Sequence, residues 1–466
     1  MNMHGTDQSP APQAAFWTLD EAARALAGEL TARAPAGIAP LTGVYTDTRA
    51  IVPGSLFVAL RGERFDAHDF LAQAVAAGAS ALVVSDATRA AGLDVPLFVV
   101  RDTLHALGAL GRHRRRAWGG PVVAVVGSNG KTSTKELLRA ALGARFRVHV
   151  TEGNLNNQVG VPLTLLALPH DAELAVVEMG TNMHGEIALL RAIGEPTMTV
   201  LTSIGEEHLE GLHDLAGVLR EESFAFDGVP VAITPSSQPE VAATARGRAG
   251  RVLEAGLESG DFHPSSWGVD PDGRGWLIAD GVTVRPALRG VHNLRNATLA
   301  LAAARELGVP IADAAAALAT MARPSMRTAW ESLGSVTLVN DAYNANPGST
   351  RAAIDLLDST PGDRQRVLVL GTMRELGAHA ERLHAELAER ALRSKADVIG
   401  GVGDFADALL ALAPDDARVV TAADAPELWP LLEARLQRDA LVLLKGSRGV
   451  RLERLVTPLT EWAARA

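Results

Sequence analysis

The stretch VVAVVGSNGKTST, residues 122–134, decides the fold class of this chain. Its first five residues form an unbroken apolar run, which is typical of a strand buried on both faces of a parallel sheet. The loop 127–130 follows with two glycines, and residues 135–142 then favour a helix. A strand, a glycine loop and a helix in this order can cradle phosphate, because backbone N–H groups and the helix N-terminus attract an anion. The stretch therefore predicts an α/β nucleotide-binding domain.

The same loop supplies candidate ligands for phosphate and for a metal ion. Lys131 can reach the β- and γ-phosphates, and Thr132 can offer its hydroxyl to Mg²⁺. The full Walker spacing requires glycine at position 125, where this chain has Val125, so the loop is a shortened variant. An ordinary tight turn that ends in Gly-Lys-Thr is the alternative interpretation. The predicted nucleotide-contacting residues of the loop are Gly127, Ser128, Asn129, Gly130, Lys131, Thr132 and Ser133.

Strands and helices alternate along the rest of the chain and predict three α/β domains, which agrees with 466 residues at about 150 residues per domain. We expect a small domain over 1–118, a central parallel-sheet ATPase domain of P-loop type over 119–322, and a Rossmann-like domain over 323–466. A first helix is predicted over 18–30. The predicted strands include 55–60, 80–85, 174–178, 197–202, 231–234, 336–340, 366–370, 397–400 and 439–444.

Composition excludes several classes of protein. The 47% hydrophobic fraction is ample for several cores, and a net charge of −10 provides no positive field for a polyanion such as DNA. The absence of cysteine excludes disulfides, thiolate metal sites and a cysteine nucleophile. Apolar runs are far shorter than the roughly 20 residues that span a bilayer, and residues 1–15 resemble a frayed tail rather than a signal peptide. We expect a soluble, cytoplasmic protein.

A basic run, Arg112-His113-Arg114-Arg115-Arg116, lies near the end of the first predicted domain. We interpret it as a solvated helix face, which is the usual role of such a run.

Two further side chains follow strands of the central domain. Glu178 ends the apolar strand 174–178, and His208 comes shortly after the strand that ends at Thr202. Ligands of open parallel sheets bind at the C-terminal ends of the strands. A carboxylate and an imidazole there could complete the coordination of Mg²⁺, although Mg²⁺ prefers oxygen and His208 could instead be a hydrogen-bonded loop residue.

Glu222 lies in the apolar stripe of the next predicted helix, together with Leu215, Val218, Leu219 and Phe226. A carboxylate in that stripe needs a partner or a metal ion. The neighbouring Glu221 lies about 100° round the helix and is expected to be solvated. A side chain that extends from the edge of the stripe to solvent is the alternative for Glu222.

Further motifs follow in order along the chain: EGNLNNQVGVPLTLL (152–166), EMGTNMHGEI (178–187), HLEGL (208–212), GVHNLRNA (290–297), NDAYNANPGS (340–349), MRELG (373–377) and KGSRG (445–449). With GSNGKT (127–132), this series resembles the Mur ligases, which use ATP to build the peptide of bacterial cell-wall precursors. The segment 46–70 resembles the uridine-nucleotide-binding domain of that family. YNANP and KGSRG resemble the member that adds D-alanyl-D-alanine to UDP-N-acetylmuramoyl-tripeptide.

The resemblance implies roles for particular residues. Lys131 and Thr132 would hold phosphates and Mg²⁺, and Glu178 and His208 would ligate Mg²⁺ with Thr132. Asn293 and Asn296 would lie against adenine, and Arg327 and Asp341 would close over the phosphates and ribose of ATP. Thr48 and Arg49 would lie at the uridine diphosphate end, Asn154, Asn156 and Asn157 near the acceptor carboxylate, and Tyr343, Asn344 and Asn346 near the dipeptide. Loop capping is the alternative for each asparagine.

The chain departs from the family pattern at several positions. Glu222 stands where the family usually has a carbamylated lysine, and we hypothesise that its carboxylate makes carbamylation unnecessary. Ser325 and Met326 precede Arg327 where the family tends to have glycine before the arginine. Ala67 and Thr372 replace a common glycine and a common acid.

The implied reaction forms an amide through an acyl phosphate, with closure of the third domain over ATP, in a monomer. A ligase that adds one amino acid to a related acceptor, or glutamate to folate, is one alternative. A non-catalytic protein that binds ATP or a cell-wall precursor is another alternative, which the missing lysine leaves open. The presence of Lys131, Thr132, Glu178 and His208 argues against a pure binder.

Overall fold

The computed structural model describes residues 17–62, 65–270, 273–322 and 326–465. The predicted tail 1–15 and the departure at Ser325 lie outside the described residues. By its internal contacts the chain forms two compact units. Among the described residues, the first unit contains those within 17–120, 151–172 and 189–195, and the second contains those within 121–150, 173–188 and 196–465. The three predicted domains, 1–118, 119–322 and 323–466, stay a prediction.

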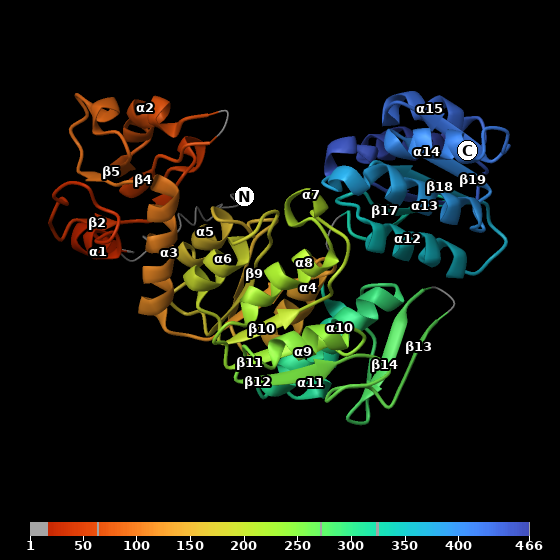
Figure 1. Cartoon of the computed structure of the whole chain (residues 1–466), viewed down its shortest axis with the longest axis horizontal. Helices are drawn as coiled ribbons and strands as arrows, with labels where there is room; N and C mark the ends of the chain where they lie inside the picture. Colours follow the sequence, from red (N-terminus) through yellow and green to blue (C-terminus); the bar gives the residue numbers. More distant parts are fainter. Residues whose placement is uncertain (1–16, 63–64, 271–272, 323–325, 466) are drawn as a thin grey trace, which may run out of the picture. The chain divides into compact units, whose positions relative to one another are not determined.

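The first unit is built on a parallel four-stranded sheet of order β3-β4-β5-β6. Its buried strand residues Leu56, Val58, Ala81 and Val83 pack with helix residues such as Leu107 into one core. The long helix α3 lies beside α5 (Figure 1). The bounds are β1 Trp17–Thr18, α1 Leu19–Ala25, β2 Pro40–Leu41, β3 Val44–Tyr45, β4 Ser55–Val58, α2 Leu71–Ala76, β5 Ala79–Val84, β6 Leu97–Val99, α3 Thr103–Trp118 and α5 Gly160–Leu166.

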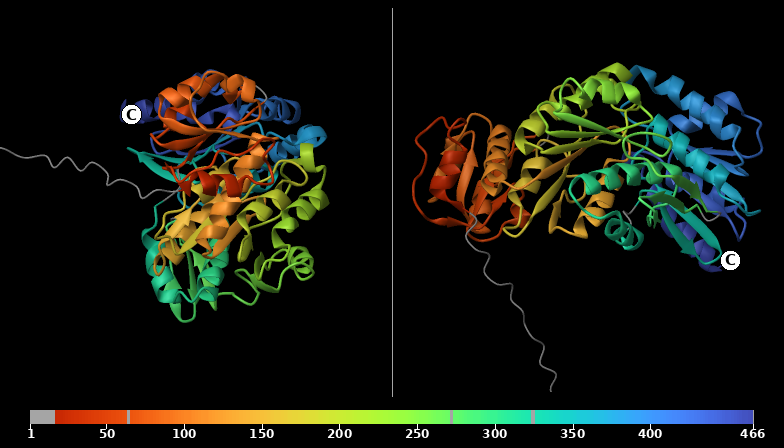
Figure 2. Two further views of the ribbon diagram at one scale, coloured as in Figure 1. Left: turned by 90° about the vertical axis from the view of Figure 1, so that its left-hand side faces the viewer. Right: turned by 90° about the horizontal axis from the view of Figure 1, so that it is seen from below.

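A six-stranded, wholly parallel sheet of order β12-β11-β10-β7-β9-β8 lies in the second unit. Every residue of β7 is buried, as expected for a strand covered on both faces. Figure 2 shows the strands in two further views. The bounds are β7 Val122–Val126, α4 Lys131–Gly143, β8 Val148–Val150, β9 Leu174–Glu178, α6 Glu186–Gly194, β10 Met198–Leu201, α7 Leu209–Leu212, α8 Leu215–Glu222, β11 Val231–Pro235, α9 Pro239–Ala245, β12 Arg251–Ala255, α10 Val291–Glu306 and α11 Ile311–Thr320.

The irregular stretch after β12 contains a small antiparallel sheet of order β13-β14-β15. The last part of the chain forms a second six-stranded sheet of order β16-β17-β21-β18-β19-β20, in which β16 alone is antiparallel to its neighbour. The bounds are β13 Ser266–Val269, β14 Gly275–Ala279, β15 Val282–Val284, β16 Ala329–Leu333, β17 Val336–Asp341, α12 Pro347–Ser359, β18 Arg366–Gly371, α13 Ala380–Leu392, β19 Val398–Val402, α14 Asp404–Leu412, β20 Val419–Ala422, α15 Ala425–Glu433, β21 Leu441–Lys445 and α16 Val456–Arg465.

The basic run on α3 is only partly a solvated face. Arg114 and Arg115 are buried, which corrects the prediction for these two residues. The guanidinium group of Arg114 donates to the carbonyl of Leu168 at 2.6 Å, just beyond the end of α5. Arg115 donates from Nε to Gly194 and from Nη2 to Glu195, both carbonyls at the end of α6 and both at 3.0 Å. The two arginines therefore satisfy carbonyl groups that helix ends leave unpaired.

The first helix is also shorter than predicted. It begins after Thr18, whose side chain forms a capping box with Glu21, and ends at Ala25 rather than Leu30.

Candidate functional site

The loop between β7 and α4 takes a shape that glycine makes possible. Gly127 has a φ of +112° and Gly130 a φ of +85°, and both values favour glycine. A Cβ atom on Gly127 would lie 2.6 Å from the hydroxyl oxygen of Thr202. Gly130 directly precedes the first residue of α4, so the loop ends at the positive end of the helix. The backbone can therefore approach an anion closely, as a phosphate cradle requires.

Lys131 lies at the first position of α4 with its ammonium group turned back over the loop. Nζ donates to the carbonyl oxygen of Gly127 and, at 3.3 Å, to that of Ser128. Glu207 Oε1 lies 3.6 Å from Nζ. Burial lowers the pKa of Lys131, but the negative charges of Glu207, Glu222 and Glu178 outweigh burial, and the pKa is raised. A protonated ammonium group is therefore held at the phosphate loop.

Thr132 and Glu178 form a buried pair beside the loop. The hydroxyl of Thr132 donates to Glu178 Oε2 at 3.0 Å. Lys135, one turn further along α4, has its Nζ 3.9 Å from the same carboxylate oxygen. Strand β9 and helix α4 thus bring two hard oxygen donors together at the C-terminal edge of the sheet, where the sequence predicted them.

These donors fit Mg²⁺ only if the bound substrate supplies further oxygens. In the part of the chain that the structure describes, no three His, Asp or Glu side chains gather into a group that could hold a metal ion. Mg²⁺ in nucleotide sites keeps several waters and takes phosphate oxygens together with one or two protein ligands. The oxygens of Thr132 and Glu178 match that requirement.

Glu222, the last residue of α8, is hydrogen-bonded to the phosphate loop. Its Oε2 accepts a hydrogen bond from the N–H of Gly127 at 2.9 Å, and its Oε1 is buried with no hydrogen-bond donor among the described residues. Burial, opposed in part by the charge of Lys131, raises the pKa of Glu222 to about 7. Glu222 as a whole residue is 1% exposed, so the alternative of a side chain that extends from the edge of the stripe to solvent is wrong.

The expectation that Glu221 is solvated is wrong. Glu221 is fully buried, and its two oxygens accept from the N–H groups of Gly185 at 2.8 Å and Ile187 at 2.9 Å. These N–H groups lie at the start of α6, where a carboxylate is favoured by the helix dipole. The helix pattern missed Glu221 because its partner lies 36 residues away in the sequence.

His208 is bonded to a carboxylate far along the chain. Its Nδ1 shares a hydrogen bond with Glu375 Oε2, and its Nε2 lies 3.7 Å from Glu207 Oε2. Burial alone would lower the pKa of His208. The hydrogen bond with Glu375 and the negative charge of Glu207 together outweigh burial, so the pKa of His208 is raised. His208 and Glu375 both have positive φ values, 51° and 64°, and such strained backbone is common at functional sites.

The segment after β17 supplies several of the predicted residues. Asn346 donates from Nδ2 to Asn129 Oδ1 at 2.8 Å, so a residue of the phosphate loop is bonded to the N-cap of α12. Asp341 accepts from Lys445 Nζ at 2.7 Å and from the N–H of Thr328 at 2.9 Å.

Other predicted residues of this segment lie near one another. The guanidinium of Arg327 stacks on the ring of Tyr343, 4.1 Å from its centroid. The carbonyl of Asn344 accepts from Lys445 Nζ at 2.8 Å, and its side chain is exposed. The hydrogen bonds from Lys445 to Asp341 and Asn344 hold the loop after β17 against β21.

The two asparagines of α10 lie against the loop. Asn296 is buried, and its side-chain amide would be 2.8 Å from a Cβ atom on Gly130. Asn293 donates to the carbonyl of Arg289 at 2.8 Å and is 3.4 Å from Asn296. Asn293 is therefore bonded locally but does not cap α10, while Asn296 lies directly beside the phosphate loop.

The remaining predicted residues belong to the first unit. Thr48 and Arg49 lie in a short turn capped by Asp47, which also pairs with the exposed Arg49 guanidinium. Asn157 accepts from the N–H of Gly160 at 2.9 Å and so caps α5, as the alternative interpretation states. Asn154 and Asn156 precede it in the same loop, exposed and half-buried respectively. Ser133 is half-buried in the first turn of α4.

Four charged residues of the site were not predicted: Glu207, Lys135, Glu375 and Lys445. Glu375 and Lys445 lie in the motifs MRELG (373–377) and KGSRG (445–449), so these motifs could have identified them as site residues. Glu207 is the residue before His208. None of the described helices combines the length and the apolar character needed to cross a membrane.

The chain is similar to known families and proteins along most of its length. Three family models match in order: "Mur ligase family, catalytic domain" over 40–115, "Mur ligase middle domain" over 125–304 and "Mur ligase, glutamate ligase domain" over 326–448. The chain is 35% identical to the UDP-N-acetylmuramoyl-tripeptide–D-alanyl-D-alanine ligase of Bacillus subtilis, over 90% of this chain and 93% of the relative. It is 36% identical to the Escherichia coli ligase of the same name, over 90% and 94%.

Solved structures agree with the sequence comparisons. A crystal structure of MurF from Acinetobacter baumannii superposes with a TM-score of 0.87 at 32% identity, over 97% of this chain and all of that one. MurF ligase from Thermotoga maritima, solved in complex with ADP, gives 0.81 at 28% identity over 91% and 98%. The family models, the relatives and the site geometry agree, and this chain belongs to the Mur ligase family.

Proposed function

We propose that this chain is an ATP-dependent amide ligase that joins D-alanyl-D-alanine to UDP-N-acetylmuramoyl-tripeptide in the synthesis of peptidoglycan precursors. The observation that carries the proposal is the phosphate loop, with the Lys131 ammonium group held over it and the Thr132–Glu178 pair beside it. The named relatives catalyse this ligation, and they match this chain over nearly its whole length.

The reaction needs an activated carboxylate. The terminal carboxylate oxygen of the tripeptide takes the γ-phosphoryl group of ATP, ADP leaves, and an acyl phosphate results. The amine of the dipeptide then attacks the carbonyl carbon, and phosphate leaves as the amide forms. Lys131 and the N–H groups of the loop offset the negative charge that spreads over the phosphoryl oxygens.

Thr132, Glu178 and His208 are the proposed protein ligands of Mg²⁺. The metal ion would neutralise charge on the transferring phosphoryl group. In this chain Glu178 accepts from Thr132, and Glu375 bonds Nδ1 of His208, which leaves Nε2 as the ring nitrogen for a ligand. The bond with Glu375 fixes the ring orientation, as outer partners of metal-binding histidines do.

Residues from beyond the central sheet complete the proposed site. Asn293 and Asn296 would contact adenine, and Arg327 and Asp341 would contact phosphate and ribose. Tyr343, Asn344 and Asn346 would meet the dipeptide. The bond between Asn346 and Asn129 supports a site that is assembled by closure of the last part of the chain over the nucleotide.

Residues of the first unit would hold the other substrate. Thr48 and Arg49 are proposed to contact the uridine diphosphate end, and Arg49 has its guanidinium exposed for this. Asn154, Asn156 and Asn157 are proposed to lie near the acceptor carboxylate. We further propose that the protein acts as a cytoplasmic monomer.

Glu222 is proposed to make carbamylation unnecessary. Its buried carboxyl supports the loop through Gly127, and its second oxygen is available in the buried site beside Lys131. A lysine at this position would have to react with carbon dioxide to supply a comparable carboxylate.

The proposal is tested by phosphate release from Mg·ATP and UDP-N-acetylmuramoyl-tripeptide, with and without D-alanyl-D-alanine, in buffer stripped of bicarbonate. We expect release that depends on the dipeptide and does not increase when bicarbonate is restored. Phosphate release that depends on a single amino acid instead of the dipeptide would favour a ligase that adds one amino acid. Release that requires bicarbonate would contradict the role of Glu222, and silence under all conditions would favour a non-catalytic binder.

A further inference from the structure

Glu207 carries a buried carboxylate for which the proposed ligation has no role. The residue is 4% exposed, and its Oε1 has no hydrogen-bond donor among the described residues. It lies after β10 in the loop that leads to α7, at the C-terminal edge of the central sheet. A buried carboxylate oxygen without a donor is costly unless a cation compensates its charge. Glu207 therefore needs a cation beside it.

Lys131 is one cation beside Glu207. Its Nζ lies 3.6 Å from Glu207 Oε1, too far for a hydrogen bond, and donates to the carbonyl groups of Gly127 and Ser128 instead. The proposed reaction requires Lys131 to bind phosphate oxygens, which are negatively charged. Within the described ranges, the ion-pair partners of Glu207 are Lys131 and His208 alone. Phosphate that draws Lys131 away thus leaves Glu207 without the compensation that burial requires.

The imidazole of His208 faces the other oxygen of Glu207. Glu207 Oε2 lies 3.7 Å from His208 Nε2. Glu375 is bonded to Nδ1, so Nε2 is the nitrogen that can take a ligand. Mg²⁺ binds its ligands at about 2.0 to 2.1 Å, so two ligands of one ion are at most about 4.2 Å apart. The distance between Oε2 and Nε2 therefore allows both atoms to bind the same ion.

Glu222 brings a second unpartnered oxygen to the same ammonium group. Its Oε1 is buried and has no donor in the part of the chain that the structure describes. Burial is the main reason that the pKa of Glu222 is raised, and the negative charge of Glu207 adds to it. The charges of both carboxylates also act on Lys131. Two buried carboxyl groups with unpartnered oxygens beside one ammonium group favour a further cation at this place.

We propose that Glu207 is a further metal-binding residue of the site. It pairs with Lys131 in the absence of nucleotide, and it binds the divalent cation through Oε2, beside His208 Nε2, when phosphate takes Lys131. The charge of Glu207 is then compensated in both states, by the ammonium group in one and by the metal ion in the other. The inference rests on the proposed function, which places Mg²⁺ and nucleotide at the phosphate loop. A glutamate that only pairs with Lys131 would instead oppose nucleotide binding equally with and without Mg²⁺.

The test measures how much Mg²⁺ strengthens the binding of β,γ-imido-ATP, a non-hydrolysable ATP analogue. Calorimetry on the full chain gives the affinity with excess Mg²⁺ and with EDTA, and the ratio of the two is the Mg²⁺ gain. Glu207→Gln should lower this gain at least about tenfold, because even residues that only orient metal ligands contribute that much to metal affinity. Glu207→Asp keeps the carboxylate on a shorter arm and should retain part of the gain. Electron paramagnetic resonance of Mn²⁺ with the analogue should show metal affinities in the same order.

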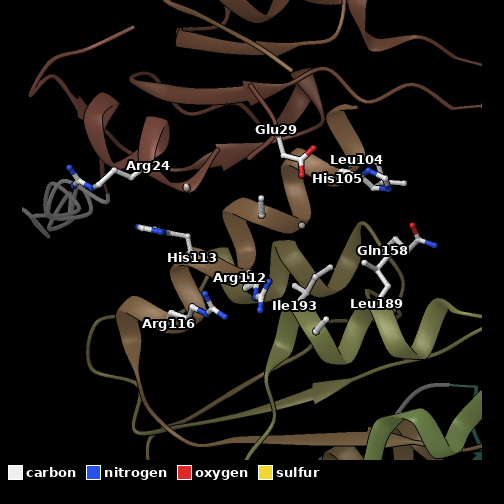
Figure 3. A pocket seen from close by; sticks show the side chains of 14 residues that line it. Arg24, Glu29, Leu104, His105, Arg112, His113, Arg116, Gln158, Leu189 and Ile193 are labelled. Atoms are coloured by element: carbon white, nitrogen blue, oxygen red, sulfur yellow. The ribbon is translucent and has the colours of Figure 1, made fainter. Parts of the chain in front are cut away.

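Two variants serve as controls. Glu206→Gln changes the neighbouring carboxylate, which is half-buried and lies 3.9 Å from Arg382 Nη2. Glu29→Gln changes a half-buried carboxylate that lines a cavity of about 480 Å³ within the first unit (Figure 3). Both controls should keep the Mg²⁺ gain of the parent protein.

A Mg²⁺ gain in Glu207→Gln equal to that of the parent protein would overturn the proposal. Should the glutamine variant fail to fold, the same result in Glu207→Asp would overturn it. An affinity for the analogue that rises by the same factor with and without Mg²⁺ would also overturn it, and would show that Glu207 only pairs with Lys131. The assay contains neither tripeptide nor dipeptide, so the role of Glu207 can fail while dipeptide-dependent phosphate release is intact. A parent protein that binds no Mg²⁺ and nucleotide together would instead refute the proposed function.

Discussion

Replacing Glu222 with glutamine should stabilise the protein at high pH and not at low pH. The unfolded carboxyl has a pKa of 4.5, and burial raises the pKa of Glu222 in the folded chain to about 7. Between these values the unfolded state releases its proton while the folded state keeps it, so stability falls as pH rises and is constant above the folded pKa. At about 1.36 kcal/mol per pH unit, the shift costs the native protein about 3 kcal/mol at pH 8.

Glutamine cannot ionise, so Glu222→Gln removes this cost. The glutamine carbonyl oxygen can still accept the hydrogen bond from the N–H of Gly127. Its NH₂ group replaces Glu222 Oε1, which has no hydrogen-bond donor, and this NH₂ group has no acceptor in the same place. An unpaired buried amide costs about 1 kcal/mol at every pH. We therefore expect the variant to be slightly less stable at pH 4.5 and about 2 kcal/mol more stable at pH 8.

The assay is thermal unfolding of both proteins in steps from pH 4.5 to pH 8, without nucleotide. Between pH 4.5 and pH 8, the difference in unfolding free energy between Glu222→Gln and the parent protein should change by about 3 kcal/mol. For a domain of about 200 residues this corresponds to a change of roughly 6 to 12 °C in the difference between their unfolding midpoints. Glu427→Gln, which alters an exposed glutamate, is the control and should change the midpoint little. A midpoint difference between Glu222→Gln and the parent protein that is the same at every pH would refute the reasoning.

Three further changes test other contacts. Glu375→Gln should raise the Mg²⁺ concentration for half-maximal phosphate release about tenfold, because the carboxylate that orients His208 is lost; an unchanged value would remove His208 from the proposed metal ligands. Arg115→Met should lower the free energy of unfolding by about 2 to 3 kcal/mol in urea denaturation, because two carbonyl groups at the end of α6 lose their donor. Asn346→Ala should lose about 1 kcal/mol of helix-cap stability and weaken ADP binding severalfold in calorimetry, because Asn129 of the phosphate loop loses its partner; ADP affinity equal to that of the parent protein would contradict the second effect.

The sequence predicted elements well where local pattern and burial agree. The strands 122–126 and 174–178 have the predicted bounds, because unbroken apolar runs are covered on both faces of a parallel sheet. The helix after the phosphate loop begins at Lys131, four residues before the predicted start. Lys131 and Thr132 are polar and carry no apolar pattern, although the preceding glycine allows the helix to begin there.

Long-range partners could not be predicted from local pattern. Arg114 and Arg115 look like members of a solvated face, yet both are buried against carbonyl groups more than 50 residues away. Glu221 was assigned to solvent by its angle on the helix, while Glu222 was expected to be buried and is 1% exposed. Helical periodicity gives the direction of a side chain but not the polar group that meets it.

Because the two units are interleaved along the chain, few fragments of this protein contain a complete unit that could fold alone. The chain passes from one unit to the other after residues 120, 150, 172, 188 and 195. A fragment that stops at residue 120 lacks α5 and Leu166, which belongs to the core of the first unit. It also leaves Arg114 and Arg115 buried without the carbonyl groups that they serve. We therefore expect the fragment 1–120, about a quarter of the chain, to be insoluble when expressed alone, and we expect the first unit to complete its folding during synthesis only after residue 195 has been made.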